Sequence, residues 1–147
     1  MALRGINHVV LKVRELERSR RFYERLGFQQ VGQRPRMIFF RAGGHPHDLA
    51  LWELGPGAVD APRQAVGLFH FCVTVESEAD LAELHSRMVA DGHPIVQVVD
   101  HVASRSFYVR DPDGNMLEIT YDVPEAEWAH LDNPFGADYP YDLPKRS

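Results

Sequence analysis

The hydrophobic positions of the chain follow one order twice: strand-like apolar segments, interrupted each time by one segment with helical spacing. In the first half, β-branched apolar residues predict a strand over 6–13, and an apolar stripe predicts a helix over 15–26. Shorter apolar segments predict further strands at 28–31, 37–41 and 47–54. The first half therefore predicts the order β-α-β-β-β.

The same order returns after residues 55–66, a segment whose prolines and glycines are typical of a linker. A strand is predicted over 68–75. Ser77 then begins a helix with a sequence typical of a capping box, and Asp91-Gly92 ends it. Three further strands are predicted at 95–99, 104–109 and 116–121.

Short sequence matches support an internal repeat. Gly5-Ile-Asn-His8 recurs 62 positions later as Gly67-Leu-Phe-His70, and Leu51-Trp-Glu53-Leu recurs 65 positions later as Met116-Leu-Glu118-Ile. We expect an α+β protein in which two tandem βαβββ units, 5–54 and 67–121, form one module over 1–122. Such units pair about a pseudo-two-fold axis, which would bring His8 toward His70 and Glu53 toward Glu118, in a cavity between curved mixed sheets.

The last predicted hairpin concentrates polar residues on otherwise apolar strands. His101 precedes the strand that contains Tyr108, an Asp-Pro-Asp-Gly turn follows, and Glu118 lies on the return strand. The three side chains can therefore face one another. Residues 123–147 differ from the rest, because prolines and aromatic residues alternate there and exclude a long helix. We expect this tail to pack on the body or on a partner subunit, with a lid over the site as the alternative.

Composition excludes several classes of function. The chain has 147 residues, 16 Lys and Arg against 21 Asp and Glu, and a formal charge of -5 without a basic cluster. This argues against nucleic acid or an anionic membrane as a partner. No apolar run reaches the roughly 18–20 residues that span a bilayer, and the first residues do not resemble a signal peptide. A single cysteine, Cys72, excludes an intrachain disulfide framework and fits the cytoplasm; on its apolar strand we expect it to be buried.

Matching histidines and carboxylates are costly to bury unless a partner neutralises them, and a divalent metal does so. Two histidines and one carboxylate on one side of a metal form the facial arrangement used by non-haem Fe(II), and Mn(II) suits the same ligand types. Alternation along the strand places His47 on the same face as Glu53. His47 is therefore either an acid–base group near the metal or an exposed residue at the end of a loop.

The chain resembles the vicinal oxygen chelate superfamily over about residues 5–122. Within it, residues 99–118 are similar to the signature of type I extradiol dioxygenases, and the chain resembles their one-module members. The signature is a histidine, five to seven residues, an apolar residue, a tyrosine, two residues, an acid, a proline, a turn residue and then a glutamate. Here these are His101, Phe107-Tyr108, Asp111-Pro112 and Glu118. The segment His45-Pro46-His47 is similar to a His-His pair of the same enzymes, with a proline inserted.

The resemblance implies ligands and roles. His8, His70 and Glu118 would bind Fe(II), His47 would be the acid–base group, with His45 as the alternative, and His101 and Tyr108 would hold the substrate. The reaction would cleave a catechol-type aromatic with O₂, next to its two hydroxyls. We expect a small aromatic substrate and a homo-oligomer, a dimer or larger.

Two other hypotheses for the function stay open. A glyoxalase-I-like isomerase or lyase uses four ligands in a matched pattern, and Glu53 would be the fourth, beside His8, His70 and Glu118. Such chemistry does not require His101 and Tyr108. A resistance or binding protein of the same fold is the other reading, although sequestering relatives generally lack the metal ligands.

Overall fold

The structure is a computed structural model that describes residues 2–3, 5–62 and 64–144. The chain divides into two compact units. Unit 1 comprises Met1–Gly67 with the short segment Asp111–Asn115, and unit 2 comprises Leu68–Arg110 with Met116–Ser147. Each unit contains the predicted βαβββ order, which confirms the α+β class with two mixed sheets.

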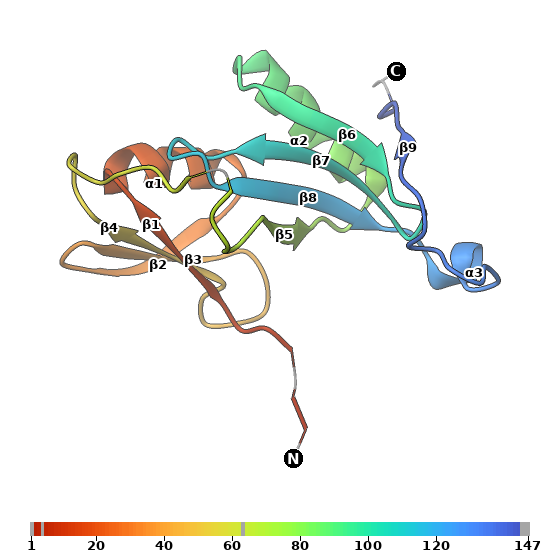
Figure 1. Ribbon diagram of the computed structural model, residues 1–147, viewed down its shortest axis with the longest axis horizontal. Helices are drawn as coiled ribbons and strands as arrows, with labels where there is room; N and C mark the ends of the chain where they lie inside the picture. Colours follow the sequence, from red (N-terminus) through yellow and green to blue (C-terminus); the bar gives the residue numbers. More distant parts are fainter. Residues whose placement is uncertain (1, 4, 63, 145–147) are drawn as a thin grey trace. The chain divides into compact units, whose positions relative to one another are not determined.

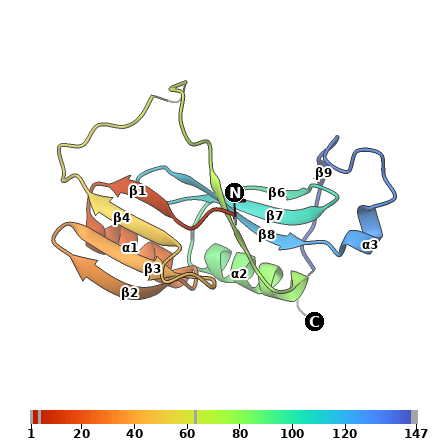
Figure 2. The ribbon, with the colours of Figure 1, turned by 90° about the horizontal axis from the view of Figure 1, so that it is seen from below.

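Unit 1 is a four-stranded sheet with one helix on it (Figures 1 and 2). The elements are β1 (Val9–Val13), α1 (Leu16–Arg25), β2 (Gln29–Arg34), β3 (Met37–Arg41) and β4 (Leu49–Glu53). The sheet order is β1-β4-β3-β2, with β1 parallel to β4 and the other pairs antiparallel. Helix α1 buries Phe22 and Tyr23 against this sheet, and Gly27 follows the helix at a positive φ of 103° that favours glycine.

The N-terminus of α1 receives its cap from a neighbouring strand. Glu15 occupies the N-cap position without a side-chain hydrogen bond to the helix. Instead, the backbone N–H of Leu16 donates to Oε1 of Glu53 at 3.1 Å. A carboxylate at this position satisfies a free N–H group and interacts favourably with the helix dipole. Glu53 thus has a structural role within unit 1.

The tight turn predicted at 111–114 is present and belongs to unit 1. Asp111 accepts hydrogen bonds from the backbone N–H groups of Asp113 and Asn115, and from the hydroxyl of Tyr23 at 2.9 Å. Burial raises the pKa of Asp111 above its ordinary value, although these hydrogen bonds oppose the shift. Asp113 pairs with Arg14. The Asp-Pro-Asp-Gly sequence therefore both turns the chain and holds it in unit 1.

Unit 2 repeats the pattern and adds the tail. Its elements are β5 (Phe71–Thr74), α2 (Glu78–Ala90), β6 (Ile95–Asp100), β7 (Ser104–Arg110), β8 (Met116–Asp122), α3 (Glu125–Trp128) and β9 (Tyr139–Pro140). The sheet order is β5-β8-β7-β6-β9, and α2 lies along one face of it (Figure 2). Ser77 accepts a hydrogen bond from the backbone N–H of Asp80, as the capping sequence predicted.

The first strand of each unit is shorter than the sequence indicated. β1 begins at Val9 instead of 6, and β5 begins at Phe71 instead of 68, because the ladders with β4 and β8 begin only at those residues. His8 and His70 each stand directly before the first strand residue, so their equivalence in the repeat is preserved. Cys72, expected to be buried, is exposed on the edge strand β5, where it pairs with Glu118 of β8.

The tail runs back over its own unit. After β8, the short helix α3 is followed by a loop, and β9 pairs antiparallel with the edge strand β6. The indole N–H of Trp128 donates to the carbonyl of Val123, and its ring lies against Phe135 at 6.1 Å between centroids. Among the residues that the structure describes, no helix is long and apolar enough to cross a membrane.

Candidate active site

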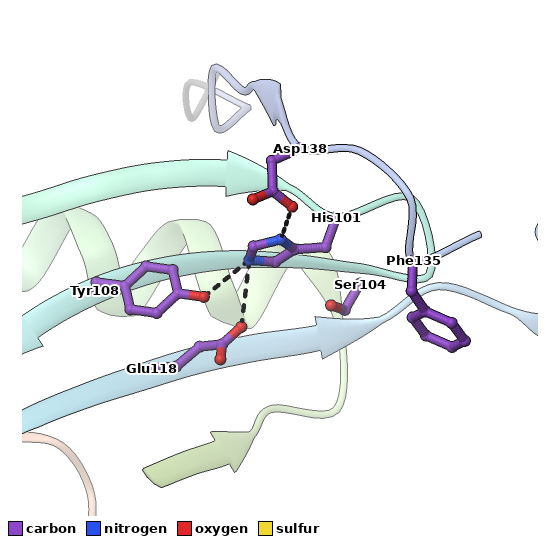
Figure 3. Close-up of a pocket in the computed structure, with 6 residues that line it drawn as sticks. All are labelled: His101, Ser104, Tyr108, Glu118, Phe135 and Asp138. Atoms are coloured by element: carbon purple, nitrogen blue, oxygen red, sulfur yellow. Dashed lines mark hydrogen bonds and ion pairs between the residues drawn. The ribbon is translucent and has the colours of Figure 1, made fainter. Parts of the chain in front are cut away.

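A polar pocket of about 240 Å³ lies within unit 2 (Figure 3). Its lining comes from the connection between β6 and β7, from the strands β7 and β8, and from the tail. It comprises His101, Ser104, Tyr108, Glu118, Phe135 and Asp138. Three of these residues were predicted to carry chemistry. The other three come from the strand face already predicted and from the tail.

Strand register places the pocket residues opposite each other. Tyr108 on β7 pairs with Glu118 on β8, and Ser106 pairs with Thr120. Because side chains alternate along a strand, Ser104, Ser106 and Tyr108 share one face of β7. The hairpin therefore presents hydroxyl groups and a carboxylate together on one side of the sheet.

Glu118 is the centre of this arrangement, and only 8% of it is exposed. Its Oε1 accepts a 2.6 Å hydrogen bond from the fully buried hydroxyl of Ser106. Its Oε2 lies 3.0 Å from Nε2 of His70, and Oε1 lies 3.6 Å from Nε2 of His101. A buried carboxylate is costly without partners, so the contacts with Ser106 and His70 determine its orientation.

His101 connects two polar groups through its two ring nitrogens. Nε2 lies 2.9 Å from the hydroxyl of Tyr108, and Nδ1 lies 2.6 Å from Oδ1 of Asp138 (Figure 3). Burial, followed by the nearby carboxylate of Glu118, raises the pKa of Tyr108 above its ordinary value. Tyr108 therefore stays protonated at neutral pH and can donate its hydroxyl proton to an acceptor in the pocket.

The donor types in unit 2 fit a divalent metal. His70 offers an imidazole nitrogen directly beside the Glu118 carboxylate, a pair suited to Fe(II), Mn(II) or Zn(II). Nδ1 of His70 is buried and has no hydrogen-bond partner in the structure, which is unusual for a buried polar atom. Within the described part of the chain, no group of three or more His, Cys, Asp or Glu side chains is arranged around a common metal position.

The remaining predicted residues, His8 and His47, lie in unit 1. Their rings contact each other at 4.5 Å between centroids, and the ring of Phe39 packs edge-on against His47 at 5.3 Å. Nδ1 of His8 donates to the side-chain oxygen of Asn7 at 2.8 Å, which leaves Nε2 as the nitrogen with a free lone pair. His45 accepts a hydrogen bond from Asn7. Of the two candidates for the acid–base role, His47 is the one in ring contact with His8.

Sequence reasoning found His101, Tyr108 and Glu118. It missed Ser104, Phe135 and Asp138 in the pocket lining, and the buried Ser106 that contacts Glu118. Ser106 lies two positions before Tyr108, so strand alternation alone would have placed its hydroxyl on the same face. Phe135 and Asp138 lie in a segment without periodicity, where no pattern connects a residue to a position in the fold.

Comparisons with known proteins agree on one family. The model of the Glyoxalase/Bleomycin resistance protein/Dioxygenase superfamily matches residues 5–119. A catechol-2,3-dioxygenase of Bacillus subtilis is 34% identical over 84% of the chain and 43% of that protein. Biphenyl-2,3-diol 1,2-dioxygenase 3 of Rhodococcus globerulus is 32% identical over 78% of the chain and 62% of that protein. The chain thus spans less than two thirds of either relative.

Among solved structures, a lactoylglutathione lyase from Agrobacterium tumefaciens has a TM-score of 0.65 and 27% identity. The match covers 82% of this chain and 96% of that one.

Proposed function

Because the chain belongs to the Glyoxalase/Bleomycin resistance protein/Dioxygenase superfamily, we propose that it is an extradiol ring-cleaving dioxygenase that acts on a catechol-type aromatic with non-haem Fe(II) and O₂. The observation that carries this proposal is the pocket in unit 2. There, His101 and the protonated Tyr108 lie beside the buried carboxylate of Glu118. A hydrolytic or purely sequestering pocket has no need for this combination of groups around a buried carboxylate.

The ligands would be His8, His70 and Glu118. His70 and Glu118 contact each other in unit 2, and His8 is assigned as the third ligand on the repeat and the family resemblance. Its hydrogen bond to Asn7 supports the assignment, because metal-binding histidines usually donate their other ring N–H to an oxygen. When bound, Fe(II) would supply Lewis acidity and a route for electrons between the aromatic substrate and O₂.

The protein's own groups would orient the substrate and move its protons. When substrate binds, the Tyr108 hydroxyl would turn from Nε2 of His101 to a substrate oxygen, and Nε2 would then accept a hydrogen bond from the substrate. His47, beside His8, would take the proton of a catechol hydroxyl and return it later. Phe135 would provide an apolar surface for the aromatic ring.

The alternative is a metal-dependent isomerase or lyase with Glu53 as a fourth ligand, which the similarity to a lactoylglutathione lyase favours. The capping role of Glu53 argues against it, because one carboxylate oxygen already accepts the Leu16 N–H. The two readings therefore differ in whether Glu53 is needed for metal binding.

The test is oxygen consumption after anaerobic purification and addition of Fe(II), with catechol and biphenyl-2,3-diol as substrates. We expect oxygen uptake together with a yellow ring-fission product, and loss of both metal and activity in His70→Ala. His130→Ala, which removes an exposed histidine outside the pocket, is the matched control and should behave as wild type. Bound metal without uptake for any catechol would refute the dioxygenase and direct attention to the isomerase.

A further inference from the structure

The tail contributes a charged group directly to the pocket. Asp138 lies just before β9, and its Oδ1 is 2.6 Å from Nδ1 of His101 (Figure 3). We propose that Asp138 is a positioning residue, which holds the imidazole of His101 so that Nε2 points toward Tyr108 and Glu118. The contact itself is independent of the reaction, whereas its effect on turnover rests on the proposed dioxygenase function.

The direction of the hydrogen bond follows from the chemistry of the two groups. An ionised carboxylate only accepts hydrogen bonds, so the proton between the groups belongs to Nδ1 of His101. A neutral imidazole carries one N–H, and its other nitrogen is then an acceptor. Nε2 can therefore accept a hydrogen bond from the Tyr108 hydroxyl, 2.9 Å away. Without Asp138, neither this tautomer nor this ring orientation would be selected.

The tail holds Asp138 in place through contacts on both sides of it. Before Asp138, Trp128 is held by its hydrogen bond to Val123, and its ring contacts that of Phe135 at a tilt of 58°. After Asp138, Tyr139 pairs with Asp100 of β6 in the β9 ladder. These contacts bracket the loop, so the position of the Asp138 carboxylate is determined by the fold of unit 2.

The tail has a further anchor beyond β9. The ring of Tyr141 lies 5.3 Å from the guanidinium carbon of Arg105, and its hydroxyl donates to Glu78. Arg105 in turn pairs with Glu78 at 2.9 Å. The segment that carries Asp138 is thus tied to both α2 and β7.

Exposure makes the proposal testable without unfolding the protein. The side chain of Asp138 is 70% exposed, whereas that of His101 is 23% exposed. Exposed ion pairs contribute little to stability, so Asp138→Ala is expected to fold as wild type. Its effect should appear in the orientation of His101, and in kcat if that orientation serves the reaction.

The first experiment determines the tautomer of His101 in the metal-free protein. Long-range ¹H–¹⁵N correlation spectra at about pH 8.5, well above the ordinary imidazole pKa of about 6.5, show which ring nitrogen carries the proton. His101→Gln assigns the signals. We expect the Nδ1–H form in wild type and in Asp132→Ala, an equal charge change at another exposed tail position, and loss of that preference in Asp138→Ala. An unchanged spectrum in Asp138→Ala would overturn the proposal.

The second experiment measures turnover of the iron-loaded enzyme. Loss of a group that orients a functional histidine is expected to lower kcat by about 10- to 100-fold, with little change in KM and in metal content. Asp138→Glu, which keeps the carboxylate, should restore part of both kcat and the tautomer preference. An equal loss of kcat in Asp132→Ala, or wild-type kcat in Asp138→Ala, would contradict the positioning role. If wild type does not consume oxygen, the proposed function fails, and the spectra still decide the Asp138–His101 contact.

Discussion

Ser106→Ala is expected to weaken metal binding although Ser106 is not a proposed ligand. Its hydroxyl, with no exposed surface, donates a 2.6 Å hydrogen bond to Oε1 of Glu118. The other carboxylate oxygen, Oε2, faces His70 at 3.0 Å. Ser106 therefore fixes the carboxylate in the orientation that presents Oε2 beside the imidazole. Alanine at this position removes that donor, so Oε1 of Glu118 loses the hydrogen bond that orients it while Oε2 keeps its contact with His70.

The size of the effect follows from the kind of hydrogen bond. A hydrogen bond to a charged group contributes about 1.5–3 kcal/mol, and each 1.4 kcal/mol is a factor of ten in binding. The metal-free variant also lacks this bond, so only part of the loss appears in metal affinity. We expect about a tenfold increase in the Kd for the metal, the lower end of the 10- to 100-fold range for groups that orient metal ligands.

The assay is anaerobic titration with Fe(II), or with Mn(II) as a stable substitute, in competition with a chelator. Ser19→Ala is the matched control, because Ser19 is also fully buried and also donates to a carboxylate, Asp113, at 3.3 Å within unit 1. Both variants should lose stability, but only Ser106→Ala should lose metal affinity. Equal Kd values for wild type and Ser106→Ala would show that the Glu118 carboxylate needs no orientation by Ser106.

Three further predictions follow from other contacts. Glu53→Ala should lower the free energy of unfolding by about 1 kcal/mol in denaturant titrations, because it removes the cap of α1, and should leave metal content unchanged; metal loss would favour the four-ligand isomerase. His47→Ala should retain metal and lose oxygen uptake, and retained turnover would remove His47 from the mechanism. Hydrogen bonds from Arg20, then Arg21, hold the pKa of Glu17 at about 2, below its ordinary 4.5, so their stabilisation is present above pH 4.5 and is lost as the pH falls toward 2. The free energy of unfolding, measured by denaturation at several pH values, should therefore depend less on pH in Glu17→Gln than in wild type over that window. An unchanged pH dependence would contradict this.

Most of the fold could be predicted because strand and helix periodicities are local properties of the sequence. The repeated βαβββ order, the cap at Ser77 and the turn after Arg110 all depend on neighbouring residues. The first residues of β1 and β5 could not be predicted, because a strand begins where a partner strand is available, and that partner is distant in the sequence. The capping role of Glu53 was not predicted for the same reason, since its contact with Leu16 joins segments 37 residues apart.

The same distinction between local patterns and contacts of distant segments applies to the candidate site. Tyr108 and Glu118 were placed opposite each other because a hairpin with a recognisable turn fixes the register of its strands. Ser106 follows from the same register, but serine is common on strands and nothing in its spacing singles it out. Asp138 could not be placed, because the sequence does not reveal that the chain after β8 returns to pair with β6.

The pocket combines residues inside the family match with residues beyond its end. The family match ends at residue 119, so it includes His101, Tyr108 and Glu118 but excludes Phe135 and Asp138. The strands thus supply the groups that the shared fold brings together, while the tail supplies an apolar wall and the partner of His101 Nδ1. Because β9 pairs with β6 and not with β8, the tail sequence can change without disturbing the strand that carries the proposed ligand Glu118. We therefore expect substitutions at Phe135 to alter the preference among catechols, measured as the ratio of kcat/KM for biphenyl-2,3-diol and catechol, while metal content stays at the wild-type level. A change in metal content in Phe135→Ala would show that the tail also supports the ligands.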